Sequence, residues 1–104
     1  MTQDEFKNQM SIYAIKEKIF KIKGMYNPNL ISNLSKEMYD LYLIRESICE
    51  QLLKLSSEKE IDIVKIKDFI KMKIKENKEK LKIETKEYEV KLLQLTIREW
   101  EEFL

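Results

Sequence analysis

The scarcity of turn-forming residues is the strongest constraint on how this chain folds. Its 104 residues contain one glycine and one proline, whereas 43% of them are hydrophobic and 38% are charged. Glycine and proline dominate tight turns, so a chain with so few of them has little material for connections. The same composition is typical of folded and not of disordered proteins. We therefore predict a single domain, residues 1–104, made of a few long elements joined by short turns.

The first predicted helix covers about residues 3–23. It opens with the spacing of a capping box, in which Thr2 caps the helix and Glu5 reaches back to the backbone of Thr2. Gly24 follows directly, and the conformational freedom of glycine suits a left-handed stop at the end of a helix.

Two more helices are predicted from their start signals. The second, about residues 28–55, begins at the Asn-Pro pair 27–28, because Asn caps helices well and Pro fits the first helical position. The third, about 58–78, begins at a second capping box formed by Ser57 and Glu60.

The stretch after the third helix has a different pattern. Its apolar residues fall on alternate positions, at Leu81, Ile83, Tyr88, Val90 and Leu92. Alternation of this kind is typical of strands, although the connection at 85–87 lacks the Gly or Asn that hairpins prefer. We predict a β-hairpin at about 80–97 and a short tail at 98–104, and thus a mostly α fold with a C-terminal hairpin. One more helix is the alternative, and it would give an all-α bundle.

Basic charge is concentrated around the third predicted helix. Residues 63–82 carry eight lysines against three acidic residues, a net charge of +5. Lysines at helical spacing opposite an apolar stripe are either a solvated helix face or a surface for the phosphates of DNA. In the second interpretation, double-stranded DNA contacts Lys65, Lys67, Lys71, Lys73, Lys75, Asn77, Lys78, Lys80, Lys82, Thr85 and Lys86.

The order helix, helix, turn, helix and hairpin over residues 29–97 resembles the winged helix-turn-helix family. Small accessory proteins of plasmids and phages in AT-rich Gram-positive bacteria use such folds, and this Lys-rich chain is similar to them in size and composition. The resemblance implies a non-enzymatic, regulatory protein that binds DNA as a dimer. The alternative is a helical module for protein–protein interaction, such as an adaptor or an inhibitor.

The end of the chain predicts where two copies would meet. Its last thirteen residues are the most apolar stretch, and exposed apolar patches usually mark interfaces. The predicted homodimer interface consists of Leu93, Leu95, Ile97, Trp100, Phe103 and Leu104.

Catalysis is not predicted. The chain has no histidine, and one cysteine and one glycine are too few for a structural zinc site or a phosphate-binding loop. No metal, cofactor or small-molecule ligand is implied. Cys49 is alone, which fits a reducing compartment, and no apolar run approaches the length of about 20 residues that spans a membrane. We predict a cytoplasmic protein without membrane contact.

One segment, residues 34–42 (LSKEMYDLY), resembles the small sporulation phosphatases that act on aspartyl phosphate. Ser35, Glu37 and Met38 match the pattern of that family. The signature aspartate falls on Tyr39, and Asp40 comes one residue later, which turns its side chain by about 100° on a helix. We therefore predict that Glu37 and Asp40 support no phosphoryl transfer.

Overall fold

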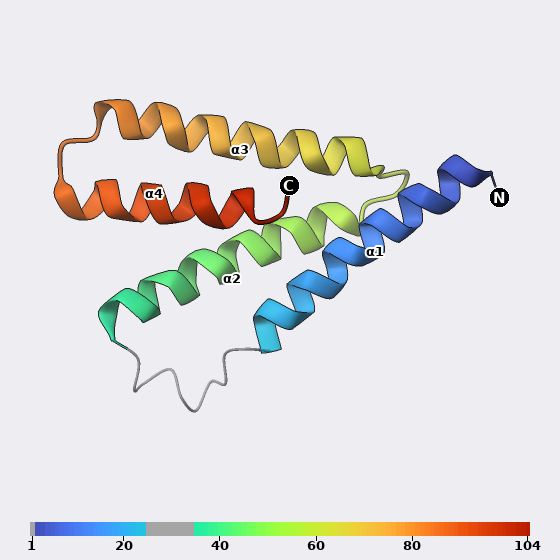
Figure 1. Ribbon diagram of the computed structural model, residues 1–104, viewed down its shortest axis with the longest axis horizontal. Coiled ribbons are helices and arrows are strands. Elements are labelled where there is room, and N and C mark those ends of the chain that lie inside the picture. The colour runs from blue at the N-terminus through green and yellow to red at the C-terminus, as the bar shows by residue number, and fades with distance from the viewer. Residues whose placement is uncertain (1, 25–34) are drawn as a thin grey trace.

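The computed structural model describes residues 2–24 and 35–104, and in these residues it contains four α-helices and no strand. The helices are α1 (Gln3–Gly24), α2 (Lys36–Ser56), α3 (Ile63–Ile83) and α4 (Glu87–Glu101). Each helix runs roughly opposite to the one before it (Figure 1). The body is flat, 50 × 37 × 18 Å, with a radius of gyration of 15.6 Å. A compact chain of this length has a radius of gyration of about 13 Å, so this one is extended.

The predicted β-hairpin at 80–97 is wrong, and with it the winged helix-turn-helix fold. Helix α3 continues to Ile83, a turn follows at 84–86, and α4 begins at Glu87. Leu81 lies seven residues after the buried Ile74, so it extends the apolar stripe of α3 by two turns. Ile83 lies on the other side of the helix and is 83% exposed. The alternation of Leu81 and Ile83 therefore reflects one partly buried and one exposed helical position, and the described residues form an all-α fold.

The turn between α3 and α4 forms without glycine or asparagine. The Glu84 carboxylate accepts hydrogen bonds from the backbone N–H groups of Thr85 and Lys86, each at 3.1 Å. Glu87 and Glu89 then occupy the first turn of α4, where negative charge is favourable because of the helix dipole. Helix α4 packs against both α3 and α2, so it needs an apolar surface around more than one side. This broad apolar surface is what resembled an alternating strand pattern.

The start of α1 is confirmed, but the predicted stop is not. The backbone N–H of Glu5 donates to the Thr2 hydroxyl at 3.1 Å, and the Thr2 N–H donates to the Glu5 carboxylate at 3.3 Å. These two bonds are the predicted capping box. Gly24 is the last helical residue and does not have a positive φ, so it is not a left-handed stop.

The second and third helices begin later than predicted. The signal at 27–28 lies outside the described residues, and α2 begins at Lys36, with the Ser35 hydroxyl accepting from the backbone N–H of Met38 at 3.3 Å. The second predicted capping box, at Ser57 and Glu60, is wrong. Glu60 has a φ of 59°, which is not helical.

Helix α3 is capped by two side chains. The Asp62 carboxylate accepts a hydrogen bond from the backbone N–H of Lys65 at 2.8 Å. The Asn8 side chain, on α1, accepts one from the N–H of Ile63 at 2.6 Å. The second bond ties the start of α3 to α1, which no local sequence signal could reveal.

One hydrophobic core joins all four helices. Its buried residues are Ile15, Ile19, Ile48, Cys49, Leu52, Ile66, Ile70, Ile74, Ile97, Trp100 and Phe103. Trp100 is 2% exposed, and its ring meets that of Phe69 edge-on, with the ring centres 5.9 Å apart. None of the described helices is long and apolar enough to cross a membrane.

Half of the residues of the predicted dimer interface are inside this core. Ile97, Trp100 and Phe103 are buried within one chain, and Leu93 and Leu95 are half-buried. Leu104 is 54% exposed. The C-terminal residues form a helix that turns its apolar side inward, so Trp100 is not at the centre of an exposed surface.

Replacing Ile70 with alanine tests this core. Ile70 is completely buried, so Ile70→Ala should lower the free energy of unfolding by about 2–5 kcal/mol, because the lost methyl groups leave a cavity. Ile83→Ala, on the same helix but exposed, should change it by no more than about 0.5 kcal/mol. Urea unfolding followed by the fluorescence of Trp100 measures both values, and equal effects would contradict the assigned packing of α3.

Candidate functional site

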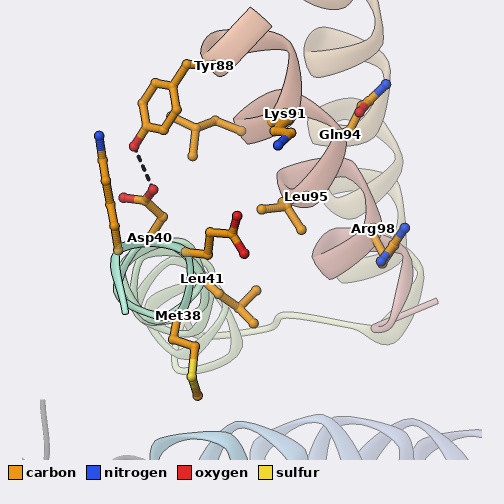
Figure 2. Close-up of a pocket in the computed structure, with 11 residues that line it drawn as sticks. Met38, Asp40, Leu41, Tyr88, Lys91, Gln94, Leu95 and Arg98 are labelled. Atoms are coloured by element: carbon orange, nitrogen blue, oxygen red, sulfur yellow. Dashed lines mark hydrogen bonds between the residues drawn. The ribbon is translucent and has the colours of Figure 1, made fainter. Parts of the chain in front are cut away.

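A groove of about 680 Å³ lies between α2 and α4. Leu41 of α2 and Leu92 and Leu95 of α4 contribute apolar side chains to its lining. Figure 2 shows Leu41 and Leu95 facing the space between the two helices, with Lys91 and Arg98 along the α4 side. The groove is thus an apolar notch with charged side chains at its edges.

One end of the groove is closed by a contact between the starts of α2 and α4. The Tyr88 hydroxyl donates a hydrogen bond to the Asp40 carboxylate at 2.6 Å (Figure 2). The Lys36 ammonium lies 4.5 Å from the centre of the Tyr88 ring, within the range of a cation–π interaction. Tyr88 therefore bridges α4 to two residues in the first turns of α2.

An ion pair joins the same two helices farther along. Arg45 of α2 contacts the carboxylate of Glu99 of α4 through two nitrogens, at 2.9 and 3.3 Å. Glu99 is only 7% exposed, and burying a carboxylate without a charged partner is costly. This bidentate contact fixes the spacing of α2 and α4, and Leu92 and Leu95 remain open between it and Tyr88.

The α4 edge of the groove is basic. Lys91, Gln94 and Arg98 follow one another at steps of three and four residues, so they share one face of the helix. All three are exposed, and neither Lys91 nor Arg98 makes an ion pair or a side-chain hydrogen bond with any residue in the described part of the chain. Two unpaired cations beside an apolar floor are suited to carboxylates of a bound partner.

Three side chains near this region have perturbed acidity. The hydrogen bond to Asp40, followed by desolvation, raises the pKa of Tyr88 above its usual 10.0. Desolvation, followed by the nearby charge of Glu46, raises the pKa of Tyr42. Burial raises the pKa of the Cys49 thiol, so this cysteine stays protonated and unreactive at neutral pH.

The residues predicted to contact DNA lie on α3 and in the turn after it. Lys80 and Lys82 belong to the last turns of α3, and Thr85 and Lys86 belong to the turn, so none of them is on a wing. Asn77 donates a hydrogen bond to the backbone carbonyl of Lys73 at 2.7 Å. Its amide is therefore already engaged with its own helix.

Five of these lysines share one exposed face of α3, here called the lysine face. They are Lys67, Lys71, Lys75, Lys78 and Lys82. At about 100° per residue they fall within an arc of about 80°, and they extend over about 22 Å. Asp68 and Glu79 border this face, but within the described residues none of the five lysines forms an ion pair. Lys73, by contrast, is paired with Glu76 at 3.8 Å.

The segment that resembles the phosphatases does not form an acidic site. Ser35 caps α2, Glu37 is exposed, and Asp40 accepts the hydrogen bond from Tyr88. In the described residues there is no group of three histidine, cysteine, aspartate or glutamate side chains that could hold a metal ion. The inactivity predicted for Glu37 and Asp40 stays a prediction.

The sequence did not point to the groove, because its α4 residues lie in the segment predicted as a hairpin. Read as a helix, the same segment contains a usable signal. Lys91, Gln94 and Arg98 line up on one side, and Leu92 and Leu95 lie next to them. The α2 side gives no comparable signal.

Titration of Tyr88 tests the closed end of the groove. The Tyr88 phenol should ionise above pH 10, and Asp40→Asn should lower its pKa toward 10.0 by removing the accepting carboxylate. A raised pKa in the folded state means that the contact stabilises the protein fully below the pKa of the unfolded chain. That stabilisation is lost as the pH rises through the folded-state pKa. NMR of ring-labelled tyrosine measures the shift, and an unchanged pKa in Asp40→Asn would contradict the hydrogen bond.

Comparison with protein-family models, with curated proteins and with solved structures found no match for this chain. Function is therefore inferred from the surfaces that the four helices form.

Proposed function

We propose that this chain is a helical protein-interaction module whose groove between α2 and α4 binds an amphipathic helix of a partner protein. The observation that carries the proposal is the combination of an apolar floor with two cations on one edge that form no ion pair within the described residues. Such grooves recognise helices through apolar anchors at steps of three and four residues.

The size of the groove suits a short helix. Along α4 it extends from Tyr88 to Arg98, which is a rise of about 15 Å. A partner helix of about three turns matches this length. Its apolar side chains would pack against Leu41, Leu92 and Leu95, which the chain itself leaves partly exposed.

The charges give the orientation of the partner. Lys91 and Arg98 make the α4 edge basic, whereas the α2 edge has Glu37 beside Lys36, whose ammonium contacts the Tyr88 ring. Asp40 is engaged by Tyr88, so its charge is less available to a ligand. The partner helix is therefore expected to present carboxylates toward α4, since complementary charge favours both encounter and register.

A non-enzymatic role is part of the proposal. The sequence has no histidine, and Cys49 is buried with a raised thiol pKa. Two acidic side chains at or near the groove connect helices, Asp40 through Tyr88 and Glu99 through Arg45, and Glu37 is exposed on the α2 edge. These contacts support binding as the function of the groove.

A designed peptide tests the groove directly. The probe is a fluorescent amphipathic helix of about three to four turns, with leucines at i, i+3, i+4 and i+7 and glutamates along one border. Fluorescence anisotropy should show saturable binding to the wild type. The double variant Lys91→Glu/Arg98→Glu should bind the peptide at least roughly tenfold more weakly. Both cations on the α4 edge are then replaced by carboxylates, which repel the glutamates of the peptide.

The control variant for this test is Lys23→Glu/Lys54→Glu, which changes the net charge equally on exposed positions away from the groove. It should bind the probe as the wild type does. A peptide of the same composition in scrambled order separates amphipathic recognition from charge attraction. Equal binding of the ordered and scrambled peptides, or equal loss in both variants, would contradict the proposed function.

A second candidate function rests on the lysine face of α3. Its five exposed lysines form no ion pair with the described residues, and they extend over about 22 Å on one side of a rigid helix. Phosphate backbones attract such a surface without reading sequence, since lysine contacts phosphates as a point charge. We propose nonspecific contact with double-stranded DNA as the activity of this face.

The lysine face is tested by charge reversal at its centre. The triple variant Lys71→Glu/Lys75→Glu/Lys78→Glu should abolish binding to a mixed-sequence DNA duplex at low salt. Each lost phosphate contact should reduce the slope of the logarithm of the binding constant against the logarithm of the salt concentration by about one unit. Lys23→Glu/Lys54→Glu/Lys59→Glu has the same change in net charge on other exposed positions. Band shifts at two salt concentrations measure the effect. If both triple variants bind equally, or the wild type binds no DNA at low salt, this second function is excluded.

A further inference from the structure

The outer face of α1 carries an apolar stripe in addition to the one that enters the core. The core-facing side of this helix has Ile15 and Ile19, both buried. The other side exposes large apolar side chains, namely Phe6 (56%), Met10 (53%), Tyr13 (63%) and Phe20 (61%). Helix α1 packs against α2 and α3 with its isoleucine side, and its aromatic side faces away from them.

The spacing of the outer stripe is that of a helix which pairs with another helix. With Glu17 included, the stripe follows steps of 4, 3, 4 and 3 residues. Its positions are Phe6, Met10, Tyr13, Glu17 and Phe20. This alternation averages 3.5 residues and is the apolar repeat of coiled coils. At about 100° per residue the five positions fall within an arc of about 80°, so they form one narrow seam.

We propose that α1 pairs through this seam with α1 of a second copy of the chain, in antiparallel orientation. The exposed parts of three aromatic rings and one methionine amount to about 400–500 Å² of apolar surface per copy. This is the size of the largest apolar patch on a typical monomer, which is often functional, and twice this area falls below the standard size of stable interfaces. The proposed pairing is therefore a weak, reversible dimer.

The charges on α1 favour the antiparallel orientation of the pair. Glu17 is the one acidic residue in the seam, and a parallel pair would place the two Glu17 carboxylates against each other. In an antiparallel pair with its twofold axis between residues 11 and 12, Glu17 of each copy lies beside Phe6 and Lys7 of the other. The same arrangement moves the basic last turns, with Lys21 and Lys23, to opposite ends of the pair. It also opposes the two helix dipoles.

A second copy fits this seam better than a lipid surface does. Helices that lie on membranes bury an uninterrupted apolar face in the acyl region, and a carboxylate there is costly. Glu17 is in the middle of the seam, so membrane insertion would bury its charge without a partner. In the dimer, Lys7 of the second copy supplies the opposite charge.

Sedimentation velocity between about 5 and 200 µM tests the dimer. The wild type should shift from monomer toward dimer over this range, and Tyr13→Glu/Phe20→Glu should remain monomeric. The matched control is Val64→Glu/Ile83→Glu, which introduces the same charges at exposed apolar positions of α3. It should dimerise as the wild type does. Neither pair is in the core, so Trp100 fluorescence and helical circular dichroism should be unchanged in both variants.

Exchange of charges tests the orientation. Glu17→Lys alone and Lys7→Glu alone should each weaken the dimer about fivefold, because each brings like charges together across the antiparallel pair. The double exchange Lys7→Glu/Glu17→Lys should restore it. Failure of the double exchange to recover would overturn the antiparallel pairing.

Three further results would overturn the dimer itself. The first is a monomeric wild type at about 200 µM, and the second is a Tyr13→Glu/Phe20→Glu variant that dimerises as the wild type does. The third is a monomeric wild type that binds vesicles of phosphatidylglycerol and phosphatidylcholine and loses this binding in Tyr13→Glu/Phe20→Glu. That result would assign the seam to an anionic lipid surface. Neither the groove nor the lysine face enters these measurements.

Discussion

The last turn of α4 and the two residues after it contact each of the other three helices, and the rest of the structure depends on these contacts. Glu99 pairs with Arg45 of α2, and Trp100 meets Phe69 of α3 edge-on. On the α1 side, the Lys18 ammonium lies 5.0 Å from the centre of the Phe103 ring and donates to the backbone carbonyl of Glu102. An ion pair, a ring contact and a cation–π contact within five residues thus fix the relative positions of all four helices.

The groove is a consequence of where these contacts are. They hold α4 close to α2 at its C-terminal end, whereas its N-terminal end reaches α2 through the long side chain of Tyr88. Leu92 and Leu95, which lie between Tyr88 and the Arg45–Glu99 ion pair, are only partly covered by the rest of the chain. Closing the groove would require α4 to move toward α2, and the buried Glu99 carboxylate would then lose its geometry with Arg45. The same ion pair that stabilises the packing therefore keeps the groove open.

The sequence predicted those features that depend on neighbouring residues. The capping box at Thr2 and Glu5 is local, and so is the apolar stripe of α3 opposite the lysines, and both are confirmed. The predicted hairpin failed because α4 is apolar on two sides, and a single sequence does not show how many neighbours a helix has. The predicted start of the third helix was wrong for a similar reason. The cap of α3 is completed by Asn8, which lies 55 residues earlier in the chain. The groove could not be predicted at all, because it arises from the spacing of two helices and not from a motif.

The proposed surfaces lie on different sides of α2, and this has a consequence for binding. In Figure 2 the blue helix α1 lies on one side of α2, and the groove lies on the other. A dimer formed through the outer face of α1 would leave both grooves accessible and would hold them on one rigid body. A partner with two helical segments could then occupy both grooves at once. Binding of its second segment becomes intramolecular, so weak individual contacts add to a much higher overall affinity. A short groove with modest affinity is thus compatible with a stable assembly, provided that α1 brings two chains together.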